Sequence, residues 1–464
     1  MIRQILISTA LLGIAGTAAA ETKYYTTDEL SDHVAVSSNG RYVVATSTDD
    51  SYSYIWDERN PEQFKQVFAD EYNHKIELYD ITNDGTAVGA YYIVDGGTGS
   101  YQPCFVTEGL IVDLPNSPMA MYLNFAKCVT SDGSVIGGQI AYNDPESEVG
   151  MRFRPCFWRL NDDWEYDLEL DPDVELPEHQ GFITTCMNPE GTVLGGRLYC
   201  AAGSEVPALY KDNKIVFWNE LETKIEPFYY KGEILGYYEN YYIDGMKDGC
   251  KGDYLTGEFV GADAWGNFYG YRTLVDWVSE DGEDYELSRY AIIYNIAEDN
   301  MLDYPAEGRI TAFSTGVGAD RQYVFCDGNR MLVGDESTEE VKSISETFGF
   351  TNASTMTAVM STSDDGRVLA GTRQEMHPAT GEYMYYPFVV VLDEPLVNNV
   401  GVEVIAENKD LAVVISKGRI DFAGVQGEVY DLDGRLMGRG ASVNLPAGIY
   451  VVKAGDMSRK VMVK

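Results

Sequence analysis

The chain has 464 residues and is strongly acidic, with 74 Asp and Glu residues against 34 Lys and Arg residues and a formal net charge of −40. Nucleic acids and anionic membrane surfaces attract Lys and Arg, so this charge disfavours both as partners. Neutral glycans, basic protein patches and divalent cations are compatible with it.

Residues 1–20 have the pattern of a secretory signal peptide. Arg3 supplies the positive charge, Ile5–Gly16 the apolar stretch and Ala18–Ala20 the small residues of a cleavage site. The apolar stretch is too short to cross a bilayer as a helix. We therefore expect an exported protein without a membrane span, located at the outer surface or extracellularly, or in the periplasm.

A polar turn followed by an apolar strand recurs along residues 21–396, with a mean period near 54 residues. The turn residues are Gly40, Gly85, Gly133, Gly191, Gly266, Arg321 (in place of glycine) and Gly366. A second strand follows each of these strands, at Ser53–Asp57, Pro103–Val106, Pro155–Trp158, Pro207–Tyr210, Ala291–Asn295, Arg330–Gly334 and Pro387–Val391. Such self-similarity is typical of stacked blades. The sequence predicts an all-β fold with a seven-bladed β-propeller, and six or eight blades are the alternatives.

The last repeat stops one strand short of a four-stranded blade. We predict that Thr22–Thr27 supplies the missing outer strand and so joins the two ends of the ring. The alternative is a leader segment that pairs with no strand.

Four of the turns carry Asn39, Asp84, Asp132 or Asp365 directly before the glycine. Asn-Gly and Asp-Gly between apolar runs are typical of type I′ turns, which need a positive φ at both central residues. No loop has the spacing of carboxylates that an EF-hand needs. We therefore assign these residues to the turns and identify no cofactor, with calcium as the alternative.

The segment Asp163–Asp171 alternates apolar and acidic residues, with Trp164 among the apolar ones. Strict alternation predicts a strand with one buried and one charged face. An outer blade strand fits this pattern, and the alternative is a cation site.

The longest spacing, between Gly191 and Gly266, contains the tyrosine-rich segment Glu226–Gly245. Its candidate ligand-binding residues are Tyr229, Tyr230, Tyr237, Tyr238, Tyr241 and Tyr242. Exposed tyrosines suit sugar rings and protein partners because they offer a flat apolar face and a hydroxyl group. The alternative is a long hairpin whose tyrosines pack on a blade.

The chain has seven cysteines, and Cys104, Cys128, Cys156 and Cys186 occupy recurring positions of the repeats. Small buried thiols are favoured over a disulfide framework at such positions. No Cys/His metal spacing, H-E-x-x-H, G-x-S-x-G or P-loop motif is present. We identify no catalytic residue and no metal ligand from the sequence.

Residues 397–464 differ from the repeats because their acidic and basic residues nearly balance. Three blocks stand out, namely Val429–Met437, Leu445–Gly455 and Lys460–Lys464. Their order and spacing resemble the C-terminal sorting domain of the Bacteroidetes type IX (Por) secretion system, although Val397–Val404 replaces the usual Pro-Asn-Pro opening. The resemblance implies a small β-sandwich, recognition by the secretion machinery, and attachment at or release from the cell surface.

The repeated phrase more loosely resembles the S-x-D-G repeats of extracellular HAF-type and TolB-like β-propellers, which supports the fold and leaves the function open. We expect an exported propeller that acts as a ligand-binding or interaction module for a glycan or a protein. One alternative is an enzyme acting on polysaccharide or peptide in the central funnel, and another is a structural surface component.

Overall fold

The computed structural model describes residues 23–31, 33–47, 52–67, 75–95, 98–144, 151–171, 174–176, 180–200, 205–217, 221–230, 233–243, 257–263, 266–278, 285–296, 299–304, 310–314, 322–326, 329–334, 337–343, 357–377, 381–393, 414–416, 419–422, 426–430, 436–445, 448–454 and 457–463. These residues form strands and turns without a helix, so none of them belongs to a helix that could cross a membrane. The predicted signal peptide lies outside them. Contacts divide the chain into two compact units, Met1–Asn398 and Asn399–Lys464.

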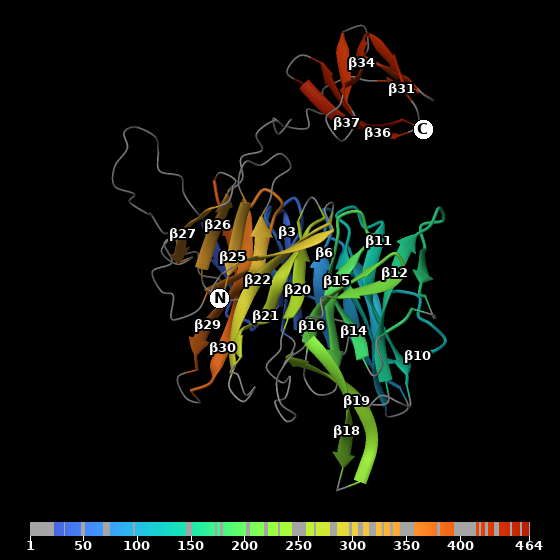
Figure 1. Cartoon of the computed structure of the whole chain (residues 1–464). Coiled ribbons are helices and arrows are strands. Elements are labelled where there is room, and N and C mark those ends of the chain that lie inside the picture. Colours follow the sequence, from blue (N-terminus) through green and yellow to red (C-terminus); the bar gives the residue numbers. More distant parts are fainter. Residues whose placement is uncertain are drawn as a thin grey trace. The chain divides into compact units, whose positions relative to one another are not determined.

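The first unit contains seven groups of four antiparallel strands (Figure 1). The first three groups are β2 (His33–Val36), β3 (Tyr42–Ser47), β4 (Tyr52–Asp57) and β5 (Phe64–Val67); β6 (Ile76–Ile81), β7 (Ala87–Asp95), β8 (Thr98–Thr107) and β9 (Leu110–Asp113); and β10 (Ala120–Val129), β11 (Val135–Asn143), β12 (Met151–Leu160) and β13 (Tyr166–Glu169). A single parallel bridge between β8 and β10 joins the second group to the third.

The other four groups continue the same pattern along the chain. They are β14 (Gln180–Met187), β15 (Leu194–Cys200), β16 (Glu205–Lys211) and β17 (Lys214–Phe217); β20 (Gly257–Ala262), β21 (Phe268–Val278), β22 (Tyr285–Asn295) and β23 (Asn300–Tyr304); β24 (Ile310–Ser314), β25 (Gln322–Cys326), β26 (Asn329–Gly334) and β27 (Ser337–Ser343); and β28 (Thr357–Thr362), β29 (Val368–Met376), β30 (Tyr383–Val391) and β1 (Lys23–Thr26). The predicted second strands therefore fall within β4, β8, β12, β16, β22, β26 and β30.

The seven groups close into a ring. Their first strands contact one another in the cyclic order β2, β6, β10, β14, β20, β24, β28 and back to β2. Among the described residues, six of these inner strands, all except β24, lead into the next strand of their own group through a turn that contains a glycine. This arrangement is a β-propeller, and its seven sheets are compatible with the seven blades that the repeat predicts.

The N-terminal strand closes the ring, as predicted. β1 pairs antiparallel with β30, with Lys23 opposite Val391 and Thr26 opposite Phe388. The ring of Tyr25 in β1 lies 5.7 Å from the ring of the fully buried Trp56 in the first sheet. The first and last parts of the propeller thus share one sheet and one apolar core.

Apolar side chains fill the space between neighbouring sheets. Val43 of the first sheet packs in one cluster with Val368 and Val389 of the last. Val44, on the other face of the same strand, belongs to a cluster with Leu78 of the second sheet. Alternate residues of one strand therefore face different neighbours, which is why these strands are apolar on both faces.

The prediction of an outer strand at Asp163–Asp171 is correct in part. β13 is the outer strand of its sheet, and its Asp167 and Glu169 are exposed while Tyr166 and Leu168 are half-buried. Trp164 does not belong to the buried face, because it sits in the preceding hairpin turn with φ 66° and an 82% exposed side chain. The alternation therefore begins two residues later than the sequence suggests.

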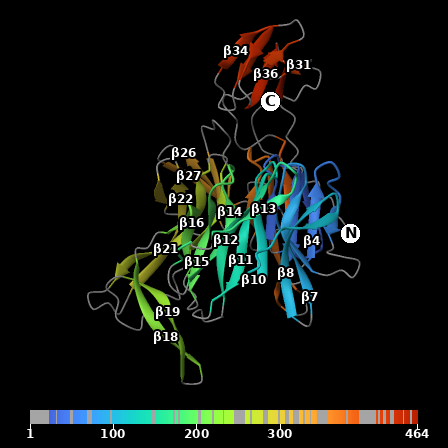
Figure 2. The same cartoon turned by 90° about the vertical axis from the view of Figure 1, so that its right-hand side faces the viewer.

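β18 (Leu221–Tyr230) and β19 (Glu233–Ile243) lie between the fourth and fifth sheets in the chain. They pair only with each other and form a separate two-stranded sheet (Figure 2). The long spacing in the repeat thus contains an inserted hairpin.

The second unit contains two antiparallel sheets. One consists of β31 (Val414–Ser416), β32 (Arg419–Asp421) and β35 (Ser442–Asn444), and the other of β33 (Gly427–Tyr430), β34 (Leu436–Gly440), β36 (Gly448–Ala454) and β37 (Met457–Val463). A buried cluster that includes Ile420, Phe422, Val429 and Val452 draws on both sheets. Two sheets around one core are compatible with the expected β-sandwich.

Candidate functional site: the axial cavity

The turns after the inner strands have one recurring hydrogen-bond pattern. The amide of Gly40 donates to the Ser37 carbonyl at 2.8 Å, and the corresponding bonds recur at the other five turn glycines. Among the described residues of these turns, only the glycines have a positive φ, such as 72° at Gly40 and 75° at Gly133. The prediction of type I′ turns is therefore wrong, because Asn or Asp at the third position does not adopt a positive φ.

The Asn and Asp residues before these glycines stabilise the turns through their side chains. The Asp132 carboxylate accepts hydrogen bonds from the Ser134 amide at 3.0 Å and the Thr130 hydroxyl at 2.8 Å. Partial burial acts to raise the pKa of Asp132, but these hydrogen bonds outweigh it and the pKa is lowered. The turn role predicted for these residues is confirmed. Among the described residues, no group of His, Cys, Asp and Glu could hold a metal ion.

Most inner strands contain a β-bulge directly below the turn. The pairing register shifts between Leu78 and Asp80 in β6, so Tyr79 has no partner across the sheet. Equivalent shifts occur in β10, β14, β20 and β28. The shift in β24 lies at the start of that strand instead, and β2 has none. A bulge re-aims the side chain of the extra residue. The extra residues of the five strands with a bulge below the turn, namely Tyr79, Lys127, Thr185, Val260 and Met360, line a common cavity.

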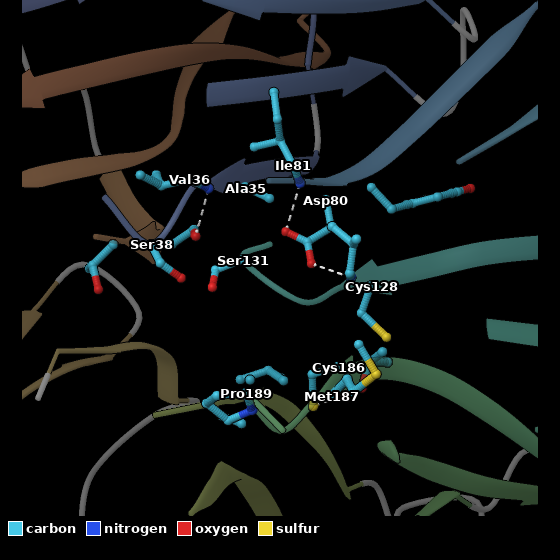
Figure 3. A pocket seen from close by; sticks show the side chains of 18 of the residues that line it. Ala35, Val36, Ser38, Asp80, Ile81, Cys128, Ser131, Cys186, Met187 and Pro189 are labelled. Atoms are coloured by element: carbon cyan, nitrogen blue, oxygen red, sulfur yellow. Dashed lines mark hydrogen bonds between the residues drawn. The ribbon is translucent and has the colours of Figure 1, made fainter. Parts of the chain in front are cut away.

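This cavity has a volume of about 380 Å³ and lies among the inner strands (Figure 3). Residues of β2, β6, β10, β14, β20 and β28 line it, together with residues of the turns that follow them. Because these turns all follow the inner strands, they mark one end of the cavity, which we call the mouth. The propeller thus provides a concave site of the size that small ligands occupy.

The mouth is surrounded by carboxylates from five blades. Asp263 and Asp364 belong to the cavity lining, and adjacent turn positions carry Asp84, Asp132, Glu190 and Asp365. The nearby cations Arg41 and Arg367 are each paired with a carboxylate, at 3.4 Å from Asp57 and 2.8 Å from Glu58. The described residues around the mouth therefore present a negative surface, which attracts cations.

Asp80 lies between two inner strands just below the mouth (Figure 3). Its carboxylate accepts hydrogen bonds from the amides of Ile81 and Val129, each at 2.8 Å. Ser361 makes the corresponding bond in the last blade, accepting from the Val36 amide at 2.9 Å. Removal from bulk water raises the pKa of Asp80 to about 7, although both hydrogen bonds act to lower it. Asp80 therefore changes its charge near neutral pH.

Farther from the mouth, Lys127 projects from β10 against aromatic rings. Its Nζ lies 3.2 Å from the centroid of the Tyr79 ring and 4.9 Å from that of Phe125. The nearby Glu77 is buried and accepts hydrogen bonds from the hydroxyl groups of Tyr79 and, at 2.9 Å, Tyr101. Burial lowers the pKa of Lys127 to about 7, against the attraction of Glu77.

Cys104, Cys128, Cys156 and Cys186 are buried free thiols, as predicted. Cys128 and Cys186 sit next to the bulges of β10 and β14 and line the cavity (Figure 3). Burial raises the pKa of Cys186 to about 12 and that of Cys128 well above its ordinary value. Protonated thiols are poor nucleophiles, so these residues pack as small apolar groups.

The six candidate tyrosines belong to β18 and β19. The structure describes the backbone of these strands, and the tyrosine side chains lie outside its described part. The register sets Tyr237 opposite Pro227 and Tyr241 opposite Thr223, with Tyr238 opposite Glu226 and Tyr242 opposite Glu222. Alternate positions of a strand belong to opposite faces. Positions 237 and 241 therefore share one face of the hairpin, and 238 and 242 share the other. Their role in binding stays a prediction.

The cavity residues Asp80 and Lys127 were not predicted from the sequence. Both have a signal in the repeat, because Asp80 stands five residues before its turn glycine and Lys127 stands six residues before its own. Other repeats carry Tyr79, Thr185 and Met360 six residues before their turn glycines, and these residues also line the cavity. An alignment of the repeats on their turn glycines would have grouped these positions.

No protein-family model matches this sequence, and no curated protein matches it. Solved structures with a similar fold include the β-propeller domain of Cps50 (Swd1) from Myceliophteria thermophila, at 10% identity over 79% of this chain and 98% of that chain, with a TM-score of 0.37. A putative TolB from Agrobacterium tumefaciens is 10% identical over 62% of this chain and 89% of that one, with a TM-score of 0.32. A prolyl endopeptidase is 11% identical over 92% of this chain and 55% of that one, with a TM-score of 0.39. These similarities carry no argument about function, and the propeller fold rests on the closed ring of sheets in this chain.

Proposed function

We propose that this protein is an interaction module that binds a positively charged segment of a protein partner at the mouth of the axial cavity. The observation that carries the proposal is the set of carboxylates around that mouth, whose neighbouring arginines are already paired. Attraction between opposite charges speeds the encounter and selects basic partners. The turns that hold these carboxylates are fixed by hydrogen bonds, so little ordering is needed on binding.

The test is the binding of a fluorescent lysine-rich peptide to the full-length protein, measured by anisotropy at low and high salt. We expect saturable binding that weakens at least tenfold at high salt, because exposed charges are screened. The mouth variant D132N/E190Q/D364N should bind at least tenfold more weakly than wild type. The matched variant E62Q/D162N/D163N removes three exposed carboxylates elsewhere and should bind as wild type does. Equal weakening by both variants would show non-specific attraction and overturn the proposal.

The tyrosine hairpin is a second candidate surface, for glycans. Supporting it is a separate two-stranded sheet in which the tyrosine positions are divided between two faces. A flat binding platform would use only one face of the hairpin. The variants Y237A/Y241A and Y238A/Y242A each change one face, so each serves as the control for the other. On a glycan array, loss of binding in only one of the two variants identifies the platform. No glycan binding by the folded wild-type protein would reject it.

We also infer that the protein is exported and held at or released from the cell surface. The basis is the signal-like pattern of residues 1–20 and the resemblance of residues 397–464 to a sorting domain. N-terminal sequencing of the protein from its host, together with protease treatment of intact cells, tests both parts. An N-terminus near residue 21 and protease sensitivity are expected, whereas an intact leader on intracellular protein would overturn the inference.

A further inference from the structure

The bulge in β10 places one amino group in the axial cavity. Its extra residue is Lys127, and the equivalent cavity-lining residues of β6, β14, β20 and β28 are Tyr79, Thr185, Val260 and Met360. Lys127 is the only lysine among the described residues that line the cavity. A compound that enters the cavity therefore meets a single primary amine.

The surroundings of Lys127 act on its charge in opposite directions. The faces of the Tyr79 and Phe125 rings lie against Nζ and attract the ammonium ion, whereas burial in the cavity wall favours the neutral amine. Burial lowers the pKa of Lys127 to about 7, even though Glu77 favours the charged form. An exposed lysine has a pKa of about 10.4, so at pH 7 the neutral fraction of Lys127 is roughly a thousandfold larger.

We propose that Lys127 is a nucleophilic amine that forms an imine with a small neutral aldehyde or ketone in the axial cavity. The Nζ lone pair attacks the carbonyl carbon, a C–N bond forms, and the C=O π bond breaks. The carbonyl oxygen then leaves as water and takes both protons from the amine, which gives a C=N bond. Atoms and charge balance without an oxidant or a reductant.

The mouth of the cavity limits which carbonyl compounds arrive. Asp364 lines the cavity, and Asp132 and Glu190 stand in the neighbouring turns, so anionic compounds such as 2-oxo acids are repelled. A volume of about 380 Å³ admits small compounds only. The expected substrates are therefore small, uncharged and carbonyl-bearing.

The test treats the full-length wild-type protein at pH 7 with glycolaldehyde and cyanoborohydride, which reduces an imine to a stable secondary amine. Peptide mass spectrometry follows labelling at Lys127 and at the exposed Lys65 and Lys214. We expect Lys127 to be labelled at least tenfold faster than either control. Labelling of Lys127 no faster than Lys65 and Lys214 would overturn the proposal.

Two further measurements separate a reactive amine from an accessible one. The labelling rate at Lys127 should level off above about pH 8, whereas that at Lys65 should rise about tenfold per pH unit up to about pH 10. Replacing glycolaldehyde with glyoxylate, an anion of similar size, should slow Lys127 at least fivefold relative to Lys65. A rate at Lys127 that follows Lys65 in both measurements would contradict the proposal.

In K127R the fast labelling phase should vanish while Lys65 and Lys214 react as before. A fast phase that persists in this variant would assign the reactive amine to another residue and overturn the proposal.

Discussion

The inner strands β2 and β6 occupy equivalent places in neighbouring blades and differ by one residue. In β2, Val34 pairs with Ala45 and no bulge is present. In β6, Leu78 pairs with Gly89, and Tyr79 bulges out of the ladder directly afterwards. A methyl group on Gly89 would lie 1.9 Å from the Glu77 carbonyl oxygen, whereas the buried Ala45 accommodates its methyl group.

In five of the seven repeats, a glycine of the second strand therefore marks the bulge. A Cβ added to any of five glycines would lie 1.9–2.1 Å from a carbonyl oxygen of the inner strand. These are Gly89, Gly138, Gly196, Gly270 and Gly371. All five face strands with a bulge. Since the bulges deliver Tyr79 and Lys127 to the cavity, these glycines matter for the site as well as for the fold.

Replacing one of these glycines should destabilise the protein more than any other change proposed here. Gly89→Val should lower the free energy of unfolding by about 4 kcal/mol or more, because a side chain there collides with the backbone of β6. Ala45→Gly, the opposite change in the blade without a bulge, should cost only about 1 kcal/mol. Urea unfolding followed by tryptophan fluorescence measures both values, since Trp56 and Trp158 are fully buried. Similar costs for the two variants would show that the bulge does not depend on the glycine.

The pH dependence of stability distinguishes the same two strands, because β6 carries Asp80 where β2 carries Ala35. The pKa of Asp80 is about 7 in the folded protein and about 3.9 in an unfolded chain. Between these values the folded state binds more protons, so the free energy of unfolding falls as the pH rises from about 4 to about 7 and is level above. A shift of about three units gives a fall of roughly 3 kcal/mol after allowance for partial exposure of the carboxyl group.

Asp80→Asn should remove this fall, and the difference between the two urea-derived pH profiles isolates the contribution of Asp80. Lys127 should act in the opposite direction. Its pKa is lowered to about 7, so the folded state binds fewer protons between about pH 7 and pH 10 and stability rises with pH there. Lys127→Met should flatten that rise. Parallel profiles for wild type and both variants would contradict the assigned protonation behaviour.

The sequence allowed the ring to be predicted because its repeats are local. Each turn carries its glycine and polar partners within a few residues, and the missing strand of the last repeat pointed to β1. The cavity could not be predicted in this way, because Lys127 gains its character from Tyr79 and Glu77 of another blade. Trp164 was misplaced for a related reason, since alternation along the chain does not show where a hairpin turn ends.

A smaller change in stability is expected at β2, the inner strand without a bulge. The Val36 amide of β2 donates to Ser361 of the last blade, and this bond helps to close the ring. Ser361→Ala should lower the free energy of unfolding by about 1 kcal/mol, because the amide loses its partner in a partly enclosed site. Ser117→Ala removes a comparable bond to the Met119 amide in an exposed turn and should cost less than about 0.5 kcal/mol. Equal stability of the two variants would show that the hydrogen bond between Val36 and Ser361 does not stabilise the ring, and that closure depends on the pairing of β1 with β30.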